Sequence, residues 1–283
     1  MEILSLIENT KPRERKDLCV ERGLSLLIRM DGKQILFDTG VKGGFAQNAQ
    51  ALGVDLAAID LAVISHHHYD HGGGLKTFLE ANQKAKVFLR KSKTEQFYFV
   101  DYWGLIKRPI GLDASLLQQH PERFVFLNHF TEIMPNGFVL TDIGRNYPVP
   151  RGSRHLFAQE GHRRKRDDFS HELMLVLWGK RGLVLLSGCS HHGILNMIEA
   201  AMAQFPGEPI RAVIGGFHLI DRPKPESMAG TPEAIQELGR QLLELPVDQI
   251  HTCHCTGLKA YPILKETMGS RLDYFQTGQK LEF

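Results

Sequence analysis

The feature that most constrains the fold is a histidine-rich motif that directly follows a short apolar strand. The strand is Leu61–Ile64, and the motif after it reads His66-x-His68-x-Asp70-His71. In extended chain alternate residues face the same side, so His66 and His68 can bind one metal ion together. Where the chain turns, Asp70 and His71 can bind a second ion beside it. Imidazole and carboxylate groups at this density are typical of sites for zinc or a similar divalent metal.

Two simpler interpretations of the histidine run are a polar surface turn and an added histidine tag. The run lies inside the chain, however, and Gly72-Gly73-Gly74 follow it, which allows the backbone to pass close to a crowded site. Neither a turn nor a tag explains an Asp-His pair at this spacing beside an apolar strand. Metal binding is therefore preferred. His67 points the opposite way and is expected to support the site rather than bind metal.

Apolar periodicity predicts strands and helices in two comparable halves. Asp31-Gly32 indicates a hairpin turn, and Ile194 to Phe205 has the pattern of an amphipathic helix. Thr231-Pro232 predicts a helix start with an N-cap, and Thr256 is expected to cap a last helix. Strands are expected at 3–7, 24–29, 34–37, 61–64, 87–89, 124–127, 138–141, 173–178, 183–186, 212–214 and 249–252.

This order of elements predicts an α+β fold in which two sheets pack face to face with helices outside. No low-complexity linker separates the halves, so residues 1–283 are expected to form one domain. The range from about 91 to 167 has the least regular pattern. It contains the aromatic run Phe97–Trp103 and the basic run Arg163–Arg166. Packing and solvation explain both runs, but a lid over the site is an alternative, with an anion clamp made by Arg163, Arg164 and Arg166.

Composition narrows the classes of partner. The 283-residue chain has 42% hydrophobic residues, as is ordinary for a globular protein, and a net charge of +2, which predicts neither nucleic-acid nor membrane binding. No apolar run approaches the roughly 18 residues of a membrane helix. The start of the chain lacks the features of a signal peptide. We expect a cytoplasmic protein with a small-molecule substrate, and the oligomeric state stays open.

The cysteines are placed like metal-site residues rather than like a disulfide framework. Cys189 lies two residues before His191, and Cys253 and Cys255 flank His254. In an extended strand Cys253 and Cys255 would face away from His254, so core packing is expected for both.

The metal motif resembles the signature of the metallo-β-lactamase superfamily. Phe37-Asp38-Thr39-Gly40 is similar to an early Asp-containing turn of that family, and the segments 187–191 and 253–257 lie where later ligand-bearing strand ends would fall. The resemblance implies a four-layer αββα sandwich with the metal site in a cleft at one edge of the sheets.

A narrower resemblance is to the subgroup that contains archaeal dihydropteroate-type synthases. Members of that subgroup make a methanopterin precursor from a dihydropterin and an aminobenzene ribotide. The match spans nearly the whole chain except about 91–167. It is carried by four segments, Glu21–Ser25, Gly188–His191, Gly215–Leu219 and His254–Gly257.

The superfamily resemblance also implies further ligands. His254 is similar to the family's last histidine and is assigned to the ion held by Asp70 and His71. Cys189 falls where many members carry a bridging aspartate. The histidine that usually precedes the strand at 173–178 is missing, so the third ligand of the first ion stays open. His191 is favoured, and the alternatives are His218, Asp168 and His171.

Two residues are given roles besides direct ligation. His218 lies at the end of a predicted strand. Besides metal ligation, two other roles fit this position, a histidine that is hydrogen-bonded at the strand end and a substrate contact that acts in acid catalysis. Asp38 is expected to orient a ligand histidine or a loop rather than to bind metal.

Three functions fit this site. Bound metal lowers the pKa of water to about 7 and polarises an ester, amide or phosphoryl oxygen. We therefore prefer a hydrolase that uses two divalent ions on a small ester or amide substrate, with or without a phosphate group. Asp70 would orient the attacking water and accept and pass on its proton. Zinc is the expected metal, and manganese and iron are alternatives.

The narrower resemblance implies instead a transferase that joins a dihydropterin and an aminobenzene ribotide through a C–N bond. A di-iron redox or sensing protein ranks last. Superfamily members of that kind resemble H-x-E-x-D-H, whereas this chain has His68 at the second position, and no flavin domain follows.

Overall fold

The chain forms two units, and each is built on a seven-stranded sheet within the described residues. The computed structural model describes residues 1–94, 96–101, 104–105, 107–221 and 226–283. Unit 1 comprises residues 1–128, 155–171 and 276–282, and unit 2 comprises residues 129–154, 172–275 and 283. The expectation that the chain is a single domain stays a prediction.

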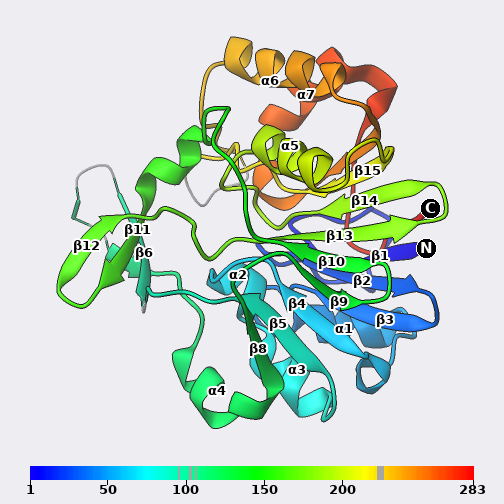
Figure 1. Cartoon of the computed structure of the whole chain (residues 1–283), viewed down its shortest axis with the longest axis vertical. Coiled ribbons are helices and arrows are strands. Elements are labelled where there is room, and N and C mark those ends of the chain that lie inside the picture. Colours follow the sequence, from blue (N-terminus) through cyan, green and yellow to red (C-terminus); the bar gives the residue numbers. More distant parts are fainter. Residues whose placement is uncertain (95, 102–103, 106, 222–225) are drawn as a thin grey trace. The chain divides into compact units, whose positions relative to one another are not determined.

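The sheet of unit 1 has the order β18-β1-β2-β3-β4-β5-β8 (Figure 1). β1, β2 and β3 pair antiparallel, whereas β3, β4, β5 and β8 run parallel. The carboxyl ends of the parallel strands therefore meet at one edge, and the metal motif follows β4 at that edge. The strands are β1 (Glu2–Ile7), β2 (Ser25–Met30), β3 (Lys33–Phe37), β4 (Leu61–Ile64), β5 (Lys86–Arg90), β8 (Phe124–Leu127) and β18 (Lys280–Glu282).

Helices cover one face of this sheet because alternate strand residues on that face are apolar. Leu36, Ala62 and Val87 of the strands form one buried cluster with Phe45 of α1 (Gly44–Ala51) and Phe78 of α3 (Leu75–Ala81). The other helical segments are η1 (Leu56–Ala58), α2 (Tyr69–Gly72), α4 (Ala114–Gln119) and η2 (Pro121–Arg123).

A small antiparallel sheet with the order β12-β11-β6-β7 also belongs to unit 1. Its strands are β6 (Gln96–Val100), β7 (Lys107–Pro109), β11 (Leu156–Glu160) and β12 (Arg163–Arg166). This sheet uses only part of the range from about 91 to 167, because β8 lies in the main sheet of unit 1 and two further strands lie in that of unit 2. Tyr102 and Trp103 of the aromatic run fall outside the described residues.

The sheet of unit 2 has the order β17-β16-β15-β14-β13-β10-β9. β14, β15, β16 and β17 run parallel, so the loops after β14, β15 and β16 leave the same edge. These loops carry the second set of candidate site residues. The strands are β9 (Thr131–Met134), β10 (Gly137–Leu140), β13 (Met174–Gly179), β14 (Gly182–Leu186), β15 (Ile210–Gly215), β16 (Val247–Thr252) and β17 (Leu272–Tyr274).

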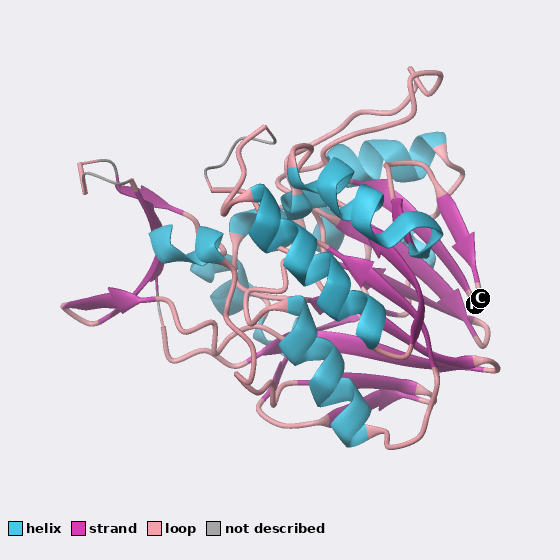
Figure 2. Cartoon of the chain, turned by 90° about the horizontal axis from the view of Figure 1, so that it is seen from above, coloured by secondary structure: helices cyan, strands magenta, loops and turns pink. Residues whose placement is uncertain are grey.

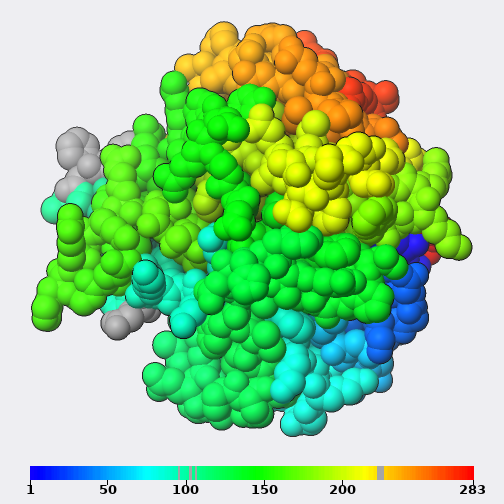
Figure 3. Space-filling view, in the orientation of Figure 1, coloured from blue at the N-terminus to red at the C-terminus, as the bar shows by residue number. Residues whose placement is uncertain are grey.

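Three helices, α5 (Ile194–Gln204), α6 (Pro232–Glu244) and α7 (Ala260–Met268), cover one face of this sheet (Figures 1 and 2). In the space-filling view α5, in yellow, and α6, in orange, are neighbours on the surface of unit 2 (Figure 3). Val176, Leu185 and Val213 of the strands share a buried cluster with Ile198 and Leu242 of the helices. The remaining helical segments are η3 (Arg151–His155), η4 (His254–Thr256) and η5 (Gly269–Arg271). No helix in the described ranges is long and apolar enough to cross a bilayer.

The two predicted helix caps of unit 2 have opposite outcomes. The Thr231 hydroxyl accepts a hydrogen bond from the Ala234 N–H at 3.3 Å, so the predicted N-cap of α6 is confirmed. The prediction that Thr256 caps the last helix is wrong, because α7 begins after Lys259. The Thr256 hydroxyl instead accepts from the Phe217 N–H at 3.0 Å and so ties the loop after β16 to the loop after β15.

Candidate metal centre

The predicted metal motif turns from β4 into α2, a helix of a single turn, in unit 1. His66, His68 and His71 are buried there, and Asp70 is half-buried. One ligand atom from each of His66, His68 and Asp70 lies within 4.8 Å of the other two. The sequence assigned Asp70 to the ion of His71, whereas this grouping places its carboxylate with the first two histidines.

Asp38 holds two of these histidines through Ser65. It follows β3 with a left-handed φ of 61° and is fully buried. Its carboxylate accepts hydrogen bonds from the Ser65 N–H at 2.7 Å, the Ser65 hydroxyl at 2.8 Å and His71 Nδ1 at 2.6 Å. Ser65 Oγ also lies 2.9 Å from His66 Nδ1. Because the serine proton is donated to Asp38, we assign the proton of this last bond to His66 Nδ1.

This network fixes the protonation of both histidines. With a proton on Nδ1, the Nε2 atoms of His66 and His71 keep their lone pairs, which are what a metal ion requires. Burial raises the pKa of Asp38, and the hydrogen bonds from His71 and Ser65 act in the opposite direction. Asp38 thus contacts His71 directly, its role in orienting a metal ligand stays a prediction, and the donors present fit a divalent metal.

His171, one alternative for the third ligand, uses both ring nitrogens for hydrogen bonds within unit 1. Its Nδ1 accepts from the His67 N–H at 3.0 Å, so the proton lies on Nε2 and is donated to Asp167 at 3.1 Å. His68 Nε2 is 3.5 Å from the same Asp167 oxygen. In this arrangement His171 orients Asp167 and has no nitrogen lone pair to offer a metal.

Asp167 is buried, whereas its neighbour Asp168, the residue named from the sequence, is partly exposed and pairs with Lys165 at 3.4 Å. Burial alone would raise the pKa of Asp167, but the neighbouring His171 and His68 hold it well below its ordinary value. Sequence reasoning missed Asp167. The signal was present in the pair of aspartates, because the first of them lies four residues before His171.

His67 contacts the Arg90 carbonyl and His171, and its supporting role at the metal motif stays a prediction. Its Nε2 donates to the Arg90 carbonyl at 2.8 Å, and burial lowers the pKa of His67 to about 3, so the ring is neutral. The side chain thus points to β5, while its backbone N–H positions His171.

The segment Glu21–Ser25, which carries part of the narrower resemblance, packs against the loop after β3 and against the metal motif. The Glu21 carboxylate accepts from the N–H groups of Val41, Lys42 and Gly44, at 2.9, 3.1 and 2.9 Å. Gly23 lies so close to the Asp70 carbonyl that a Cβ atom would collide with it. The segment therefore fixes how closely the metal motif approaches the first loops of unit 1.

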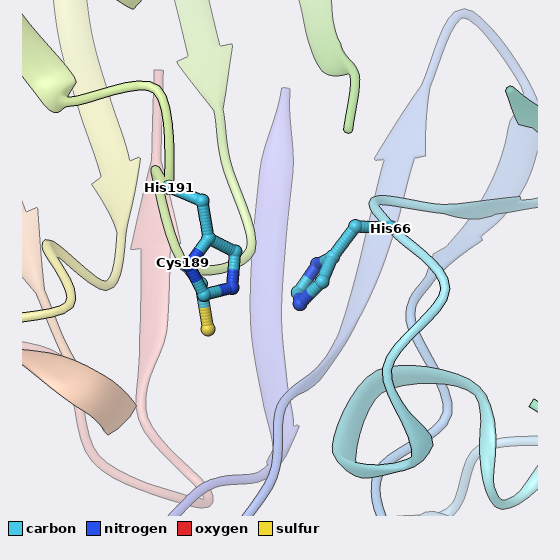
Figure 4. Close-up of side chains that lie close together, drawn as sticks. All are labelled: His66, Cys189 and His191. Carbon is cyan, nitrogen blue, oxygen red and sulfur yellow. The ribbon is translucent and has the colours of Figure 1, made fainter. Parts of the chain in front are cut away.

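In unit 2 the loop after β14 carries Cys189 and His191, both buried (Figure 4). Figure 4 also draws His66 on the loop after β4 of unit 1. The fully buried Glu172 organises the unit 2 loop, since its two carboxylate oxygens accept from the N–H groups of His191 at 2.7 Å and His192 at 2.9 Å. His192 Nδ1 donates to the second oxygen at 2.7 Å.

Glu172 is a second functional residue that sequence reasoning missed. Burial alone would raise its pKa, but the bonds from His192 and the two backbone N–H groups hold it below the ordinary value. It lies just before β13, at the position where the family resemblance predicts a histidine. It therefore sets the position of His191, the favoured third ligand, from the place where a ligand had been expected.

His218 and His254 follow β15 and β16, and both have left-handed backbone, with φ of 48° and 50°. His254 is buried, and His218 is partly exposed. One ligand atom each from His218, Cys189 and Cys255 lies within 4.8 Å of the others. Burial raises the pKa of the Cys255 thiol, but hydrogen bonding to Cys189 and the neighbouring His254 and His218 bring it well below its ordinary value.

The basic run forms β12 and is divided between the two faces of the small sheet. In the antiparallel register of β11 and β12, Arg164 lies opposite Gln159 and Arg166 lies opposite Phe157. Arg163 lies opposite Glu160, and its side chain is on the other face of the sheet. All three arginines are exposed. The anion clamp of Arg163, Arg164 and Arg166 stays a prediction, and only Arg164 and Arg166 share a face.

Comparisons with known proteins identify the family of the chain. Residues 20–205 match the family model of the metallo-β-lactamase superfamily. The chain is 29% identical over 281 residues to 7,8-dihydropterin-6-methyl-4-(β-D-ribofuranosyl)-aminobenzene-5′-phosphate synthase of Methanocaldococcus jannaschii, covering 93% of this chain and 90% of that protein.

Comparison with solved structures indicates the same superfamily. The crystal structure of Tm1679, a metal-dependent hydrolase of the β-lactamase superfamily, matches with a TM-score of 0.82 and 32% identity over 100% of this chain and 99% of that one. Zn²⁺-bound PqqB from Methylobacterium extorquens shares the fold alone, with a TM-score of 0.59 and 12% identity over the whole of both chains.

The chain belongs to the metallo-β-lactamase superfamily. The α+β fold of that type, expected from the sequence, is confirmed. Proteins of this superfamily typically bind metal ions, and this chain has candidate ligand groups for them.

Proposed function

We propose that the chain is a metal-dependent hydrolase that uses two divalent ions, most simply zinc, on a small ester or amide substrate. The observation that carries the proposal is the hydrogen-bonded network of Asp38 and Ser65, which places the ring protons of His66 and His71 on Nδ1, so that Nε2 of each ring carries the lone pair of a ligand atom. A purely structural histidine cluster would have no need of such protonation control. The likeness to Tm1679, at 32% identity, supports the same class.

The ligand assignment made from the sequence stays part of this proposal. One ion takes His66, His68 and His191. The other takes Asp70, His71 and His254, with Cys189 as a shared ligand. When bound, the ions would lower the pKa of water to about 7 and polarise the substrate carbonyl or phosphoryl oxygen.

The protein's own contribution is orientation and proton transfer. Asp70 is half-buried and places a carboxylate oxygen within 4.8 Å of ligand atoms of His66 and His68. In that place it can hold the attacking water and accept its proton. Asp167, anchored by His171, lies 3.5 Å from Nε2 of His68.

Turnover by protein that has been stripped of metal and reloaded with zinc tests the proposal. We expect hydrolysis of at least one class within a panel of phosphoesters, lactones and amides, and loss of that activity on chelation. Asp70→Asn should lower kcat by a factor of about 100 or more. Asp60→Asn is the matched control, because Asp60 is an aspartate of unit 1 that binds Lys33 and the Gln34 N–H away from the motif. Metal-loaded protein that is inert across the panel would contradict hydrolysis.

The alternative is a transferase that joins an activated dihydropterin to an aminobenzene ribotide through a C–N bond. The likeness to the M. jannaschii synthase favours it, since that match covers most of both chains. Quenching of dihydropterin fluorescence on titration with metal-loaded protein tests it. Saturable binding together with product formation from the two substrates would replace hydrolysis as the function, and absence of pterin binding would exclude the transferase.

A further inference from the structure

We propose that Cys189, His218 and Cys255 form a metal site of their own within unit 2, selective for a soft or borderline ion such as Zn²⁺. The site goes beyond the proposed hydrolase, whose ligand set does not include Cys255. The sequence predicts core packing for Cys255 and leaves three roles open for His218, namely a hydrogen-bonded strand-terminal residue, a metal ligand, and a substrate contact or acid catalyst.

The three side chains converge from three loops at one sheet edge. Cys189 follows β14, His218 follows β15, and Cys255 follows β16. One ligand atom from each lies within 4.8 Å of the other two. A tetrahedral zinc site with Zn–S bonds of about 2.3 Å separates its two sulfur atoms by about 3.8 Å, which is compatible with ligand atoms that lie within 4.8 Å of one another.

His218 supplies an independent sign that this position can bind a ligand. Its Nδ1 is buried and has no hydrogen-bond partner among the described residues. An orphaned buried ring nitrogen costs free energy unless something binds it. The residue is also held at a left-handed φ of 48°, a conformation that costs free energy in a residue other than glycine.

The surroundings fit a thiolate ligand at Cys255. The His218 backbone N–H donates to Cys255 Sγ at 3.3 Å, a bond that strengthens when the sulfur becomes a thiolate. A Cβ atom on Gly216 would collide with the same sulfur, so the glycine makes room for it. Cys189, Cys255 and Ile220 form a small buried cluster, which keeps water from the sulfur atoms.

Two thiolates and one imidazole define the class of ion. Soft sulfur ligands favour Zn²⁺, and they disfavour Mg²⁺, Ca²⁺ and Mn²⁺, which prefer oxygen. Three protein ligands leave a fourth position for water or an exogenous group. Cys189 is common to this site and to the proposed dinuclear centre, so Cys255 is the residue that distinguishes them.

Cobalt spectroscopy on the whole chain tests the site. Metal-stripped protein is titrated with Co²⁺, and the thiolate-to-cobalt charge-transfer band is measured in the near ultraviolet. Wild type should show the absorbance of two thiolates, and Cys255→Ser should lose about half of it. Cys253→Ser is the matched control, because Cys253 is equally buried two residues earlier and belongs to none of the candidate ligand groups of the described residues. Its spectrum should equal that of wild type.

A full band in folded Cys255→Ser would overturn the proposal, and so would equal losses in both variants. Should Cys255→Ser fail to fold, wild-type protein gives the answer through labelling. Iodoacetamide alkylation is followed by mass spectrometry at each cysteine, with and without Zn²⁺. Zinc should slow labelling of Cys189 and Cys255 by about tenfold or more and leave Cys253 unchanged. An unchanged rate at Cys255, or equal slowing at all three cysteines, would refute the site.

These measurements do not depend on turnover. A protein that hydrolyses nothing can still show the Cys255-dependent band, and an active hydrolase can lack it. Failure of this inference is therefore distinguishable from failure of the proposed function.

Discussion

Replacement of Asp38 by asparagine should weaken metal binding without changing the fold. The carboxylate accepts three hydrogen bonds, and only one of them, from the Ser65 N–H, can be kept by the amide oxygen. The new NH₂ group then faces two donors, the Ser65 hydroxyl and His71 Nδ1. The serine can rotate to accept. The His71 ring can accept only if its proton moves to Nε2, which removes the lone pair required by a metal ion.

The expected loss of zinc affinity in Asp38→Asn follows from this change of tautomer. Loss of a group that orients a metal-binding histidine typically lowers affinity by about 10- to 100-fold. At about 1.4 kcal/mol for each factor of ten, that corresponds to about 1.4–2.8 kcal/mol. The apo variant should remain folded, because the amide fits the space of the carboxylate and removes a charge whose burial is unfavourable.

Competition between protein and a chromogenic chelator for Zn²⁺ measures this affinity, and circular dichroism of the apo protein checks the fold. Asp60→Asn is the control, since Asp60 also accepts a backbone N–H in unit 1, from Gln34 at 2.9 Å, and its side chain pairs with Lys33. Zinc affinity equal to wild type in a folded Asp38→Asn protein would refute the reasoning. An equal loss in Asp60→Asn would show that the effect is not specific to the histidines.

Three further predictions concern the support of the site. Glu172→Gln should lower the free energy of unfolding by about 2–3 kcal/mol at neutral pH. The folded pKa of Glu172 lies below its ordinary value of 4.5, so this stabilisation is present above that value and is lost as the pH falls. Urea unfolding should therefore show a smaller difference between wild type and Glu172→Gln at about pH 4 than at about pH 7. Gly23→Ala should cost about 1–3 kcal/mol in thermal unfolding, whereas Gly43→Ala, whose Cβ would meet nothing closer than 3.5 Å, should cost little. His171→Asn should leave the number of metal ions per chain unchanged in elemental analysis and reduce zinc affinity by up to about tenfold; loss of a whole equivalent would make His171 a ligand.

The main strands were predictable because their information is local. The predicted strand Leu61–Ile64 matches β4, and the predicted strand at 124–127 matches β8, since each is a short apolar run next to a polar or turn signal. The motif after β4 contains four candidate ligands within six residues, so their proximity required no knowledge of tertiary structure.

The supporting groups could not be predicted in the same way, because long-range contacts select them. The four-residue spacing to His171 is a weak local sign of Asp167, and only the fold buries this residue beside His171 while Asp168 stays partly exposed with Lys165. The small sheet was missed for a related reason. β6 and β11 pair across about sixty residues of sequence, and their run of aromatic residues has no clear period.

Backbone strain connects the fold to the candidate centre and shows why local patterns were not sufficient. Among the described residues other than glycine, positive φ occurs at Asp31 and Asn136 in hairpin turns, and otherwise at Asp38, Phe169, Ser190, His218 and His254. Each of the last five lies in a loop that carries a candidate ligand or its support. Such conformations cost of order 1–3 kcal/mol each and persist only where surrounding contacts impose them. These five residues do not lie in hairpin turns, so we explain their strain by the need to fix the direction of imidazole, carboxylate and thiol groups. Binding of an ion to those groups would then offset part of the free energy that the strain costs.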